Sequence, residues 1–398
     1  KTLAMNLLPA IEKTARDVTI SHVFLMFGYK LFSLYFPLFL VAKNFSLPEI
    51  GITHFFIYLP IALCAPVVGF LTHKISPAFL IIAGITGYAL YSLGMMVLEN
   101  TVLFYLLQIV LGVSAALFFV STKTMLMDSK NAKVDHSFAW FYSAPSLADA
   151  LAPIVGALVI FNFGFFGAFL LSFLIHACNV AFALVQLRKA KVQRLEAAQP
   201  HDKTKEIYKE ILLGLKRSAV FPLLFISFLV LVLGGFNNAF FVLFLKELGY
   251  SQNQILLFGS VLSFFALPLS VWVIKEVKKQ ASRINIIRGS EIVGFFSLVL
   301  GAFSSFLILP LLFVLMLGKN IGGLMTSSGR SGLMFQHSKG RPAEAGALDT
   351  VFGPLATAFG AIIGGPLILV LGYPAIFMLS GAILLLGGVL TNSFARKE

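Results

Sequence analysis

Twelve apolar runs, each close to the length of about 20 residues that a helix needs to cross a bilayer, take up most of this sequence. Only 12% of its 398 residues are charged, about half of the share of about 25% that soluble domains carry. The runs are expected to be helices, because the strands of a membrane barrel alternate in polarity over about ten residues. The sequence therefore predicts an all-α integral membrane protein, with spans near residues 19–42, 50–72, 78–98, 101–124, 138–162, 164–187, 220–245, 253–275, 284–306, 308–329, 346–371 and 373–393.

Basic residues between the runs predict the orientation of the chain. They gather in alternate connections, which contain Lys74, Lys130, Lys278, Lys339 and the long segment 188–218. Positively charged loops stay on the cytoplasmic side, so both termini and the 188–218 linker are expected to be cytoplasmic, in a cell (inner or plasma) membrane. The same loops explain the formal net charge of +13, so we expect no nucleic acid partner.

No group of residues has the spacing of a catalytic or metal site. The two cysteines, Cys64 and Cys178, lie in apolar runs without metal-ligand spacing, and the sequence contains no phosphate-binding loop for ATP. We therefore expect neither an enzyme nor a cofactor, and uphill transport would draw on a gradient. The first residue is a lysine, so the natural N-terminus is expected upstream, and no cleavable signal peptide is visible.

The two halves of the sequence resemble each other. YFPLFLVAKNFSLPEI at 35–50 aligns with FFVLFLKELGYSQNQI at 240–255, and FGFFGAFLLS at 163–172 aligns with LGYPAIFMLS at 371–380 at nearly the same offset. So constant an offset indicates two parallel six-span repeats. The expected units are an N-terminal bundle over 1–187, a cytoplasmic linker over 188–218 and a C-terminal bundle over 219–398.

The arrangement of two six-span repeats joined by a long cytoplasmic connection resembles that of the major facilitator superfamily of secondary transporters. The resemblance extends over essentially the whole chain. GFLTHK at 69–74 is similar to the family's signature between spans 2 and 3. Gly69 and Lys74 match that signature, whereas His73 stands where the family has an aspartate. The resemblance implies gating roles for these three residues.

A second motif, APIVGA at 152–157, is similar to the family's antiporter signature in span 5. Pro153 and Gly156 match, and alanines replace two glycines. The resemblance implies a gating role here too, while the alternative is close helix packing through small residues.

Two lysines lie near the middle of spans, where a cation costs roughly 2.5–3.5 kcal/mol on insertion scales. Lys30 is the only charged residue between Asp17 and Lys43, and Lys319 is the only one between Glu291 and Arg330. The resemblance places spans 1, 4, 7 and 10 around a central cavity, so the two lysines would face it from opposite halves. Such a pair would suit a small-molecule anion that both halves grip.

Further polar residues are candidates for the same substrate site. Neutral ones could orient a substrate by hydrogen bonds or join neighbouring helices, and basic ones near inner ends of spans could extend a positive path or anchor the helix at the lipid headgroups. The candidates are Ser33, Gln108, Asn237, Asn238 and Thr326, together with Lys123 and Arg330.

The two lysines could instead be neutralised within the protein. If Asp149 of span 5 paired with Lys30 and Asp349 of span 11 paired with Lys319, no net positive site would remain. The pairs would then hold helices together or act as conformational latches. The sequence leaves both interpretations open.

Proton coupling requires a group that changes its protonation state during the cycle. The candidates in or near spans are Asp149, Asp349, Glu291 and His22.

The leading hypothesis is a secondary active transporter, symporter or antiporter, that moves a small organic anion by alternating access. It would use H⁺ as a candidate coupling ion, lie among membrane lipid and work as a monomer, as the resemblance implies. The alternative is a proton-coupled exporter of hydrophobic or amphipathic compounds such as drugs or lipids, favoured by the span 5 motif, the 42 phenylalanines and Asp149. A receptor or scaffold that keeps the fold is a third hypothesis, which no sequence feature supports.

Overall fold

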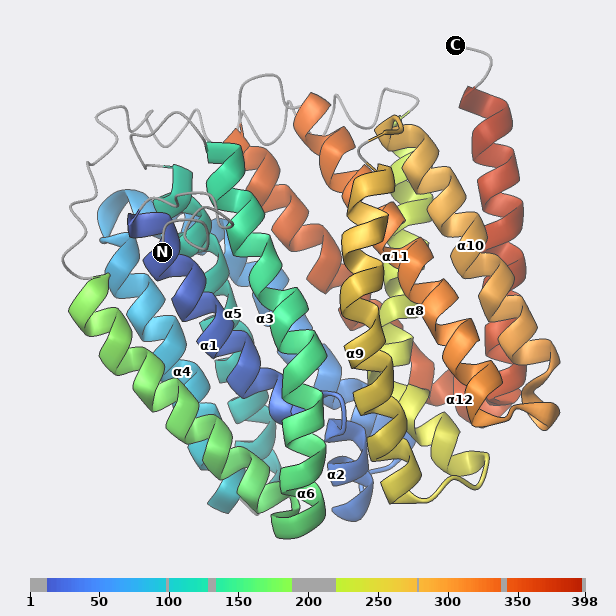
Figure 1. Ribbon diagram of the computed structural model, residues 1–398, viewed down its shortest axis with the longest axis horizontal. Helices are drawn as coiled ribbons and strands as arrows, with labels where there is room; N and C mark the ends of the chain where they lie inside the picture. Colours follow the sequence, from blue (N-terminus) through green and yellow to red (C-terminus); the bar gives the residue numbers. More distant parts are fainter. Residues whose placement is uncertain are drawn as a thin grey trace, which may run out of the picture.

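Long helices that run side by side make up the described part of this protein, as the computed structural model shows (Figure 1). The structure describes residues 13–97, 100–127, 134–187, 220–277, 279–337 and 342–395. The predicted 188–218 linker lies outside these residues. The first half of the chain forms α1 (Lys13–Ser33), α2 (Phe36–Ala42), α3 (Leu47–Lys74), α4 (Pro77–Val97), α5 (Thr101–Met127) and α6 (Val134–Gln186). The second half forms α8 (Val220–Glu247), α9 (Gln252–Val277), α10 (Ser282–Ala302), the 3-10 turn η2 (Ser304–Phe306), α11 (Leu309–His337) and α12 (Pro342–Ala395).

The predicted set of twelve spans is confirmed in these helices. Nine of the described helices are long and apolar enough to cross a membrane, or ten if the pair α1 and α2, bent by 41°, counts as one span. Two of the ten, α6 and α12, each contain two spans, because their backbones break at Gly164 (φ 64°) and Gly372 (φ 72°). Glycine adopts this left-handed conformation without a steric penalty.

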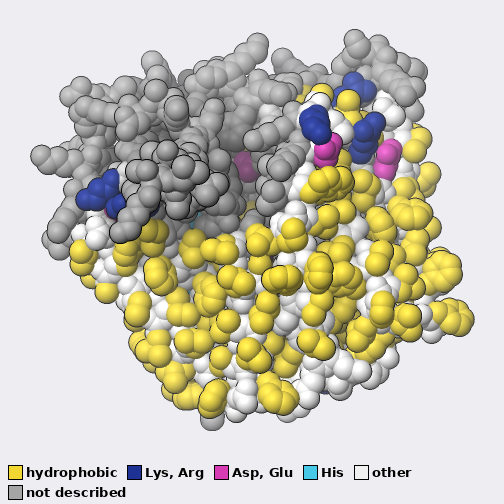
Figure 2. Space-filling view, in the orientation of Figure 1, with side chains coloured by type: hydrophobic (Ala, Val, Ile, Leu, Met, Phe, Trp, Pro, Cys, Tyr) yellow, Lys and Arg dark blue, Asp and Glu magenta, His cyan; other side chains and the backbone are white. Residues whose placement is uncertain are grey.

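The surface agrees with a membrane setting. Large apolar side chains such as Phe163 and Val370 are mostly exposed, and yellow side chains are spread over the described part of the face in Figure 2. Charged side chains among the described residues of that face lie in its upper part. The protein is a multi-pass membrane protein, and the described residues contain no strand.

The helix packing repeats between the two halves. In the first half α1 packs on α6, and α4 packs on both α5 and α6; in the second half α8 packs on α12, and α10 packs on both α11 and α12. The contacts between the halves are also symmetric. α3 of the first half packs on α12 of the second, and α9, the equivalent of α3, packs on α6, the equivalent of α12. The fold is therefore two six-span bundles related by pseudo-symmetry, as the sequence repeat predicts.

Glycines set the closest approach of equivalent helices in the two halves. A Cβ atom on Gly156 of α6 would collide with the carbonyl oxygen of Leu31 in α1, and one on Gly360 of α12 would collide with that of Val232 in α8. The span 5 motif therefore brings α6 against α1, and GAIIGG at 360–365 does the same for α12 and α8.

Gly360→Ala tests this packing. The new methyl group would meet the carbonyl of Val232 and the amide nitrogen of Phe236, which lies 2.9 Å from the Cβ position. We expect a loss of about 1–3 kcal/mol in the free energy of unfolding, the usual range for overpacking, measured by thermal or denaturant unfolding in detergent. The matched control is Gly353→Ala in the same helix, where a Cβ atom meets nothing within 4 Å. Equal losses in the two variants would contradict the packing argument.

We call the end of the bundle that contains Lys13, Leu187 and Val220 the linker end, and the opposite end the far end. Near the far end the two halves come into backbone contact, because Cβ atoms on Gly51 of α3 and Gly365 of α12 would collide with the carbonyl oxygens of Ala361 and Leu47.

The hydroxyl of Tyr35 adds a polar contact between the halves. Tyr35 is fully buried at the break between α1 and α2. Its hydroxyl lies 3.0 Å from the carbonyl oxygen of Leu256, 3.2 Å from that of Pro153 and 3.2 Å from the hydroxyl of Ser260. One phenol thus joins α6 of the first half to α9 of the second half.

Tyr35→Phe should loosen the far end. The substitution removes hydrogen bonds worth about 1 kcal/mol net and leaves the ring in place. We expect faster hydrogen–deuterium exchange in residues 43–51 of the far end. Tyr250→Phe is the control, because the Tyr250 hydroxyl donates to the carbonyl of Leu307 within the second half, at 2.7 Å. Similar exchange in the two variants would argue against a contact that holds the halves together.

Candidate functional site

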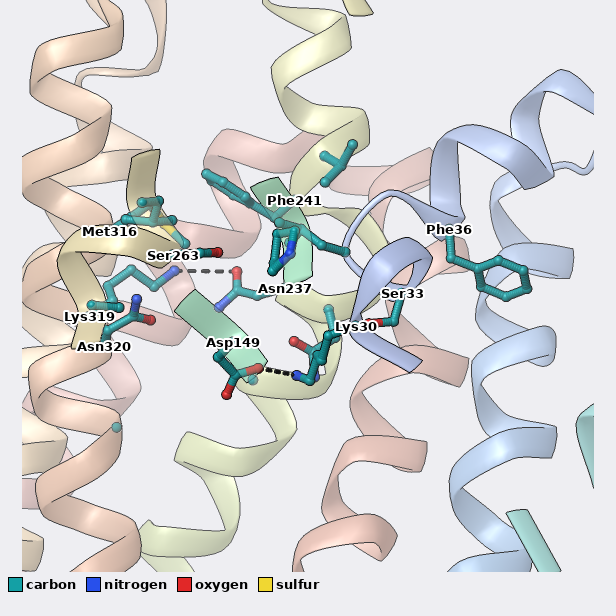
Figure 3. A pocket seen from close by; sticks show the side chains of 18 of the residues that line it. Lys30, Ser33, Phe36, Asp149, Asn237, Phe241, Ser263, Met316, Lys319 and Asn320 are labelled. Carbon is teal, nitrogen blue, oxygen red and sulfur yellow. Dashed lines mark hydrogen bonds and ion pairs between the residues drawn. The ribbon is translucent and has the colours of Figure 1, made fainter. Parts of the chain in front are cut away.

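A cavity of about 650 Å³ lies between the two halves, within the range of about 300–1,000 Å³ for small-molecule sites. Its wall comes from α1, α2, α3, α4 and α6 of the first half and α8, α9, α10 and α11 of the second. Spans 1, 7 and 10 line it as the resemblance implies, whereas α5, which is span 4, contributes none of the described lining residues. Figure 3 shows the polar part of the cavity.

Lys30 and Asp149 form an ion pair in the cavity wall. The Lys30 Nζ lies 2.7 Å from Asp149 Oδ1, and the two side chains are 29% and 47% exposed. The predicted alternative in which Asp149 neutralises Lys30 is therefore confirmed. The pair is open to the cavity (Figure 3), which distinguishes it from an ion pair packed between helices.

Lys319 faces the cavity from α11 with neutral partners. Its Nζ donates to Asn237 Oδ1 at 3.3 Å and lies 4.7 Å from the centre of the Phe377 ring. No carboxylate among the described residues forms an ion pair with it. The amide oxygen and the ring face stabilise the ammonium group but leave its charge uncompensated.

The alternative in which Asp349 neutralises Lys319 is wrong. Asp349 instead accepts hydrogen bonds from Arg330 and from Ser331 Oγ. The reason is depth in the membrane: Lys319 and Arg330 are three helical turns apart, about 16 Å at 1.5 Å per residue. Asp349, near the linker end of α12, is level with Arg330.

Two predicted substrate residues lie away from the cavity. Gln108 is buried against α4, where it accepts a hydrogen bond from the Tyr91 hydroxyl at 3.1 Å and donates to the carbonyl of Phe104. Thr326 is buried against Gly289 of α10 and donates to the carbonyl of Gly322 at 2.9 Å. The amide of Gln108 and the hydroxyl of Thr326 therefore form hydrogen bonds at helix contacts and do not face the cavity.

The two basic residues near the linker end also lie outside the cavity wall. Arg330 pairs with Asp349 and lies 5.1 Å from the centre of the Phe352 ring. Lys123 of α5 donates to Thr350 Oγ1 of α12 at 2.7 Å, across the two halves. Arg330 therefore adds little net charge, and Lys123 is a contact between the halves.

Of the four candidates for proton coupling, Asp149 alone lines the cavity among the described residues. His22 is buried, with its Nδ1 3.1 Å from the carbonyl of Phe141 and its ring stacked on that of Phe141. Glu291 lies beside Arg288 in a separate groove between α10 and α12. Asp349 is held by Arg330.

The predicted gating residues occupy two places. Gly69 and Lys74 lie in the last turns of α3, at the linker end, with the Lys74 ammonium 4.6 Å from the Phe70 ring centre. The side chain of His73 lies outside the described residues. Pro153 lines the cavity four residues after Asp149, and Gly156 packs on α1.

The cavity also has polar residues that the sequence did not single out. Ser33, Asn237 and Asn238 line it as expected, and they are joined by others on the same walls. These are Tyr29, His54, Tyr58, Tyr91, Ser263, Ser270, Asn320 and Ser327. The sequence does not show which way each side chain points around its helix, and that direction decides which polar residues face the cavity.

Removing the carboxylates of the two ion pairs should have unequal effects on stability. Asp349→Asn leaves Arg330, only 7% exposed, buried without its counter-ion, and breaking a buried pair costs about 3–5 kcal/mol. Asp149→Asn frees Lys30 into an open cavity, where exposed pairs are worth under about 1 kcal/mol. Thermal unfolding in detergent compares the two variants. Equal destabilisation would mean that the Lys30 pair is structural.

The sequence matches the Major Facilitator Superfamily over residues 18–346. No curated protein matches it. Solved structures with a similar fold include a POT family transporter in complex with 5-aminolevulinic acid, which is 14% identical, with a TM-score of 0.79 over 96% of both chains.

Two other similar structures are a mutant of the nucleoside transporter NupG and a D-xylose-proton symporter. The first is 12% identical, with a TM-score of 0.77 over 96% of this chain and 99% of that chain. The second is 14% identical, with a TM-score of 0.77 over 95% of this chain and 96% of that chain. At these identities the likeness shows the fold alone.

Proposed function

Since this chain belongs to the major facilitator superfamily and is therefore a secondary transporter, we propose that it moves a small organic anion across a cell membrane by alternating access. Lys319 is the residue that holds the anion. The termini and the linker face the cytoplasm in this proposal, because the basic connections lie on that side, and the protein works as a monomer without a cofactor.

The uncompensated charge of Lys319 is the observation that carries the proposal. A cation within a span is costly and marks a functional site unless the protein supplies a counter-charge. Lys319 has only Asn237 and Phe377 as partners among the described residues. An anionic substrate supplies the missing negative charge when it enters the cavity.

The neighbours of Lys319 suit an acid group. The amide oxygen of Asn237 accepts the hydrogen bond from Lys319, so its NH₂ group can donate to a substrate oxygen. Asn320 lies beside Lys319 in the cavity (Figure 3) and offers a second amide. One similar structure holds 5-aminolevulinic acid, an organic acid, although the likeness to that protein extends to the fold only.

Lys30 provides the link between anion binding and the motion of the halves. It lies in the first half and Lys319 in the second, so an anion in contact with both would stabilise a closed arrangement. The anion first binds Lys319 while the Lys30–Asp149 pair stays intact. When the halves then close, an anion that draws Lys30 away from Asp149 would leave that carboxylate unpaired within the membrane. An unpaired acid there favours its neutral form, so Asp149 would take up a proton and couple transport to H⁺.

The apolar residues of the cavity wall favour a second function. Aliphatic and aromatic side chains of the second half, among them Leu233, Phe241, Leu262 and Met316, line the cavity. An exporter of amphipathic compounds that uses Asp149 as its proton carrier would also fit these residues. It differs from the first proposal in that transport would not require Lys319.

Uptake assays in proteoliposomes separate the two functions. We expect Lys319→Gln to lower the uptake of organic anions about tenfold or more, since removing a charged partner of a buried anion costs at least about 1.4 kcal/mol. Lys30→Gln should also lower uptake. Lys246→Gln, at the far end of α8, is the control and should transport as the parent does.

The substrates to compare are carboxylates, phosphate esters and neutral amphiphiles. Unchanged anion uptake by Lys319→Gln would refute the anion proposal. Flux of neutral amphiphiles that Asp149→Asn abolishes, with Lys319→Gln still active, would establish the exporter instead.

A further inference from the structure

We infer that Asp149 sets the charge of the substrate, so that the cavity accepts a monoanion and rejects a dianion of similar size. This inference rests on the proposed function and deepens it. It follows from the formal charges of the cavity wall and from the open position of one carboxylate oxygen.

The charged groups of the wall leave a single positive charge uncompensated. Among the described residues, Lys30, Asp149 and Lys319 are the charged side chains that line the cavity. Asp149 compensates Lys30 at 2.7 Å, and Lys319 has neutral partners. One negative charge on the substrate therefore balances the site.

Asp149 keeps part of its carboxylate free. Oδ1 contacts Lys30, and no hydrogen bond to Oδ2 is found among the described residues, although the side chain is 47% exposed. The free carboxylate oxygen of Asp149 thus presents negative charge to the cavity and repels a second acid group.

The positions of the two sites make this repulsion selective. An acid group held by Lys319 of α11 leaves the rest of the substrate to extend toward α1 and α6 of the other half, where Asp149 lies (Figure 3). An apolar body meets no penalty there. A second carboxylate meets Asp149, and juxtaposed like charges are a common means of excluding a wrong ligand.

Binding measurements on the purified full-length protein test the inference with matched pairs of acids. The pairs are hexanoate with adipate and benzoate with terephthalate, compared by isothermal titration at about pH 7.5, where carboxyl groups of ordinary pKa are ionised. We expect each monoanion to bind at least about tenfold more tightly than its dianion. Asp149→Asn leaves both lysines uncompensated, so the preference should disappear or reverse.

The double variant Lys30→Gln/Asp149→Asn controls for damage to the structure. It removes both members of the pair and restores a single positive charge at Lys319. The part of the preference that comes from charge balance should therefore return, without the part that comes from repulsion by Asp149. A purely structural effect of Asp149→Asn would persist in the double variant.

The outcomes separate this inference from the proposed function. Equal affinity of the parent protein for monoanions and dianions, or a tenfold preference that persists in Asp149→Asn, would overturn the inference alone. Failure of the parent protein to bind either monoanion would overturn the proposed anion site together with it.

Discussion

Charged groups within a membrane need partners, because the hydrocarbon offers neither water nor counter-ions. This protein meets that constraint in different ways at the linker end and in the cavity. Near the linker end, Arg330 has both Asp349 and a phenyl ring. In the cavity, Lys30 has Asp149, while Lys319 has an amide and a ring but no carboxylate among the described residues. The proposed substrate site is the place where the described residues leave this requirement unmet.

The scaffold is symmetric, whereas its chemistry is not. Equivalent helices pack in the same way in both halves, and Gly156 and Gly360 play matching parts in that packing. The two cavity lysines, however, come from spans that do not correspond, span 1 and span 10. The repeat therefore determines where a cavity forms, and substitutions within each half determine what the cavity binds.

The sequence predicts features that depend on local chemistry or on the period of hydrophobicity. The spans, the short breaks between them near residues 163 and 372 and the repeat are of this kind, since a stretch of about 20 apolar residues and its interruption are properties of short segments. The membership of the major facilitator superfamily agrees with the resemblance that these features carry.

Ion-pair partners and the directions of side chains around a helix are harder to predict from the sequence. Pairing Asp349 with Lys319 required the relative heights of two helices, and Arg330 is the residue at the right height. Gln108 and Thr326 lie on spans near the cavity but are turned toward neighbouring helices. Asn320 and the tyrosines of the wall could be recognised only once the rotation of each helix was known.

The unlike contacts at the two ends of the bundle have a kinetic consequence. At the far end the halves meet through backbones brought together by Gly51 and Gly365, with the Tyr35 phenol locked between carbonyls. At the linker end, Lys123 reaches Thr350 with a long, flexible side chain. A flexible side chain can release its partner by a rotamer change, whereas packed backbones must separate together. The activation barrier for opening the far end should therefore be the higher one, and that step should set the turnover rate.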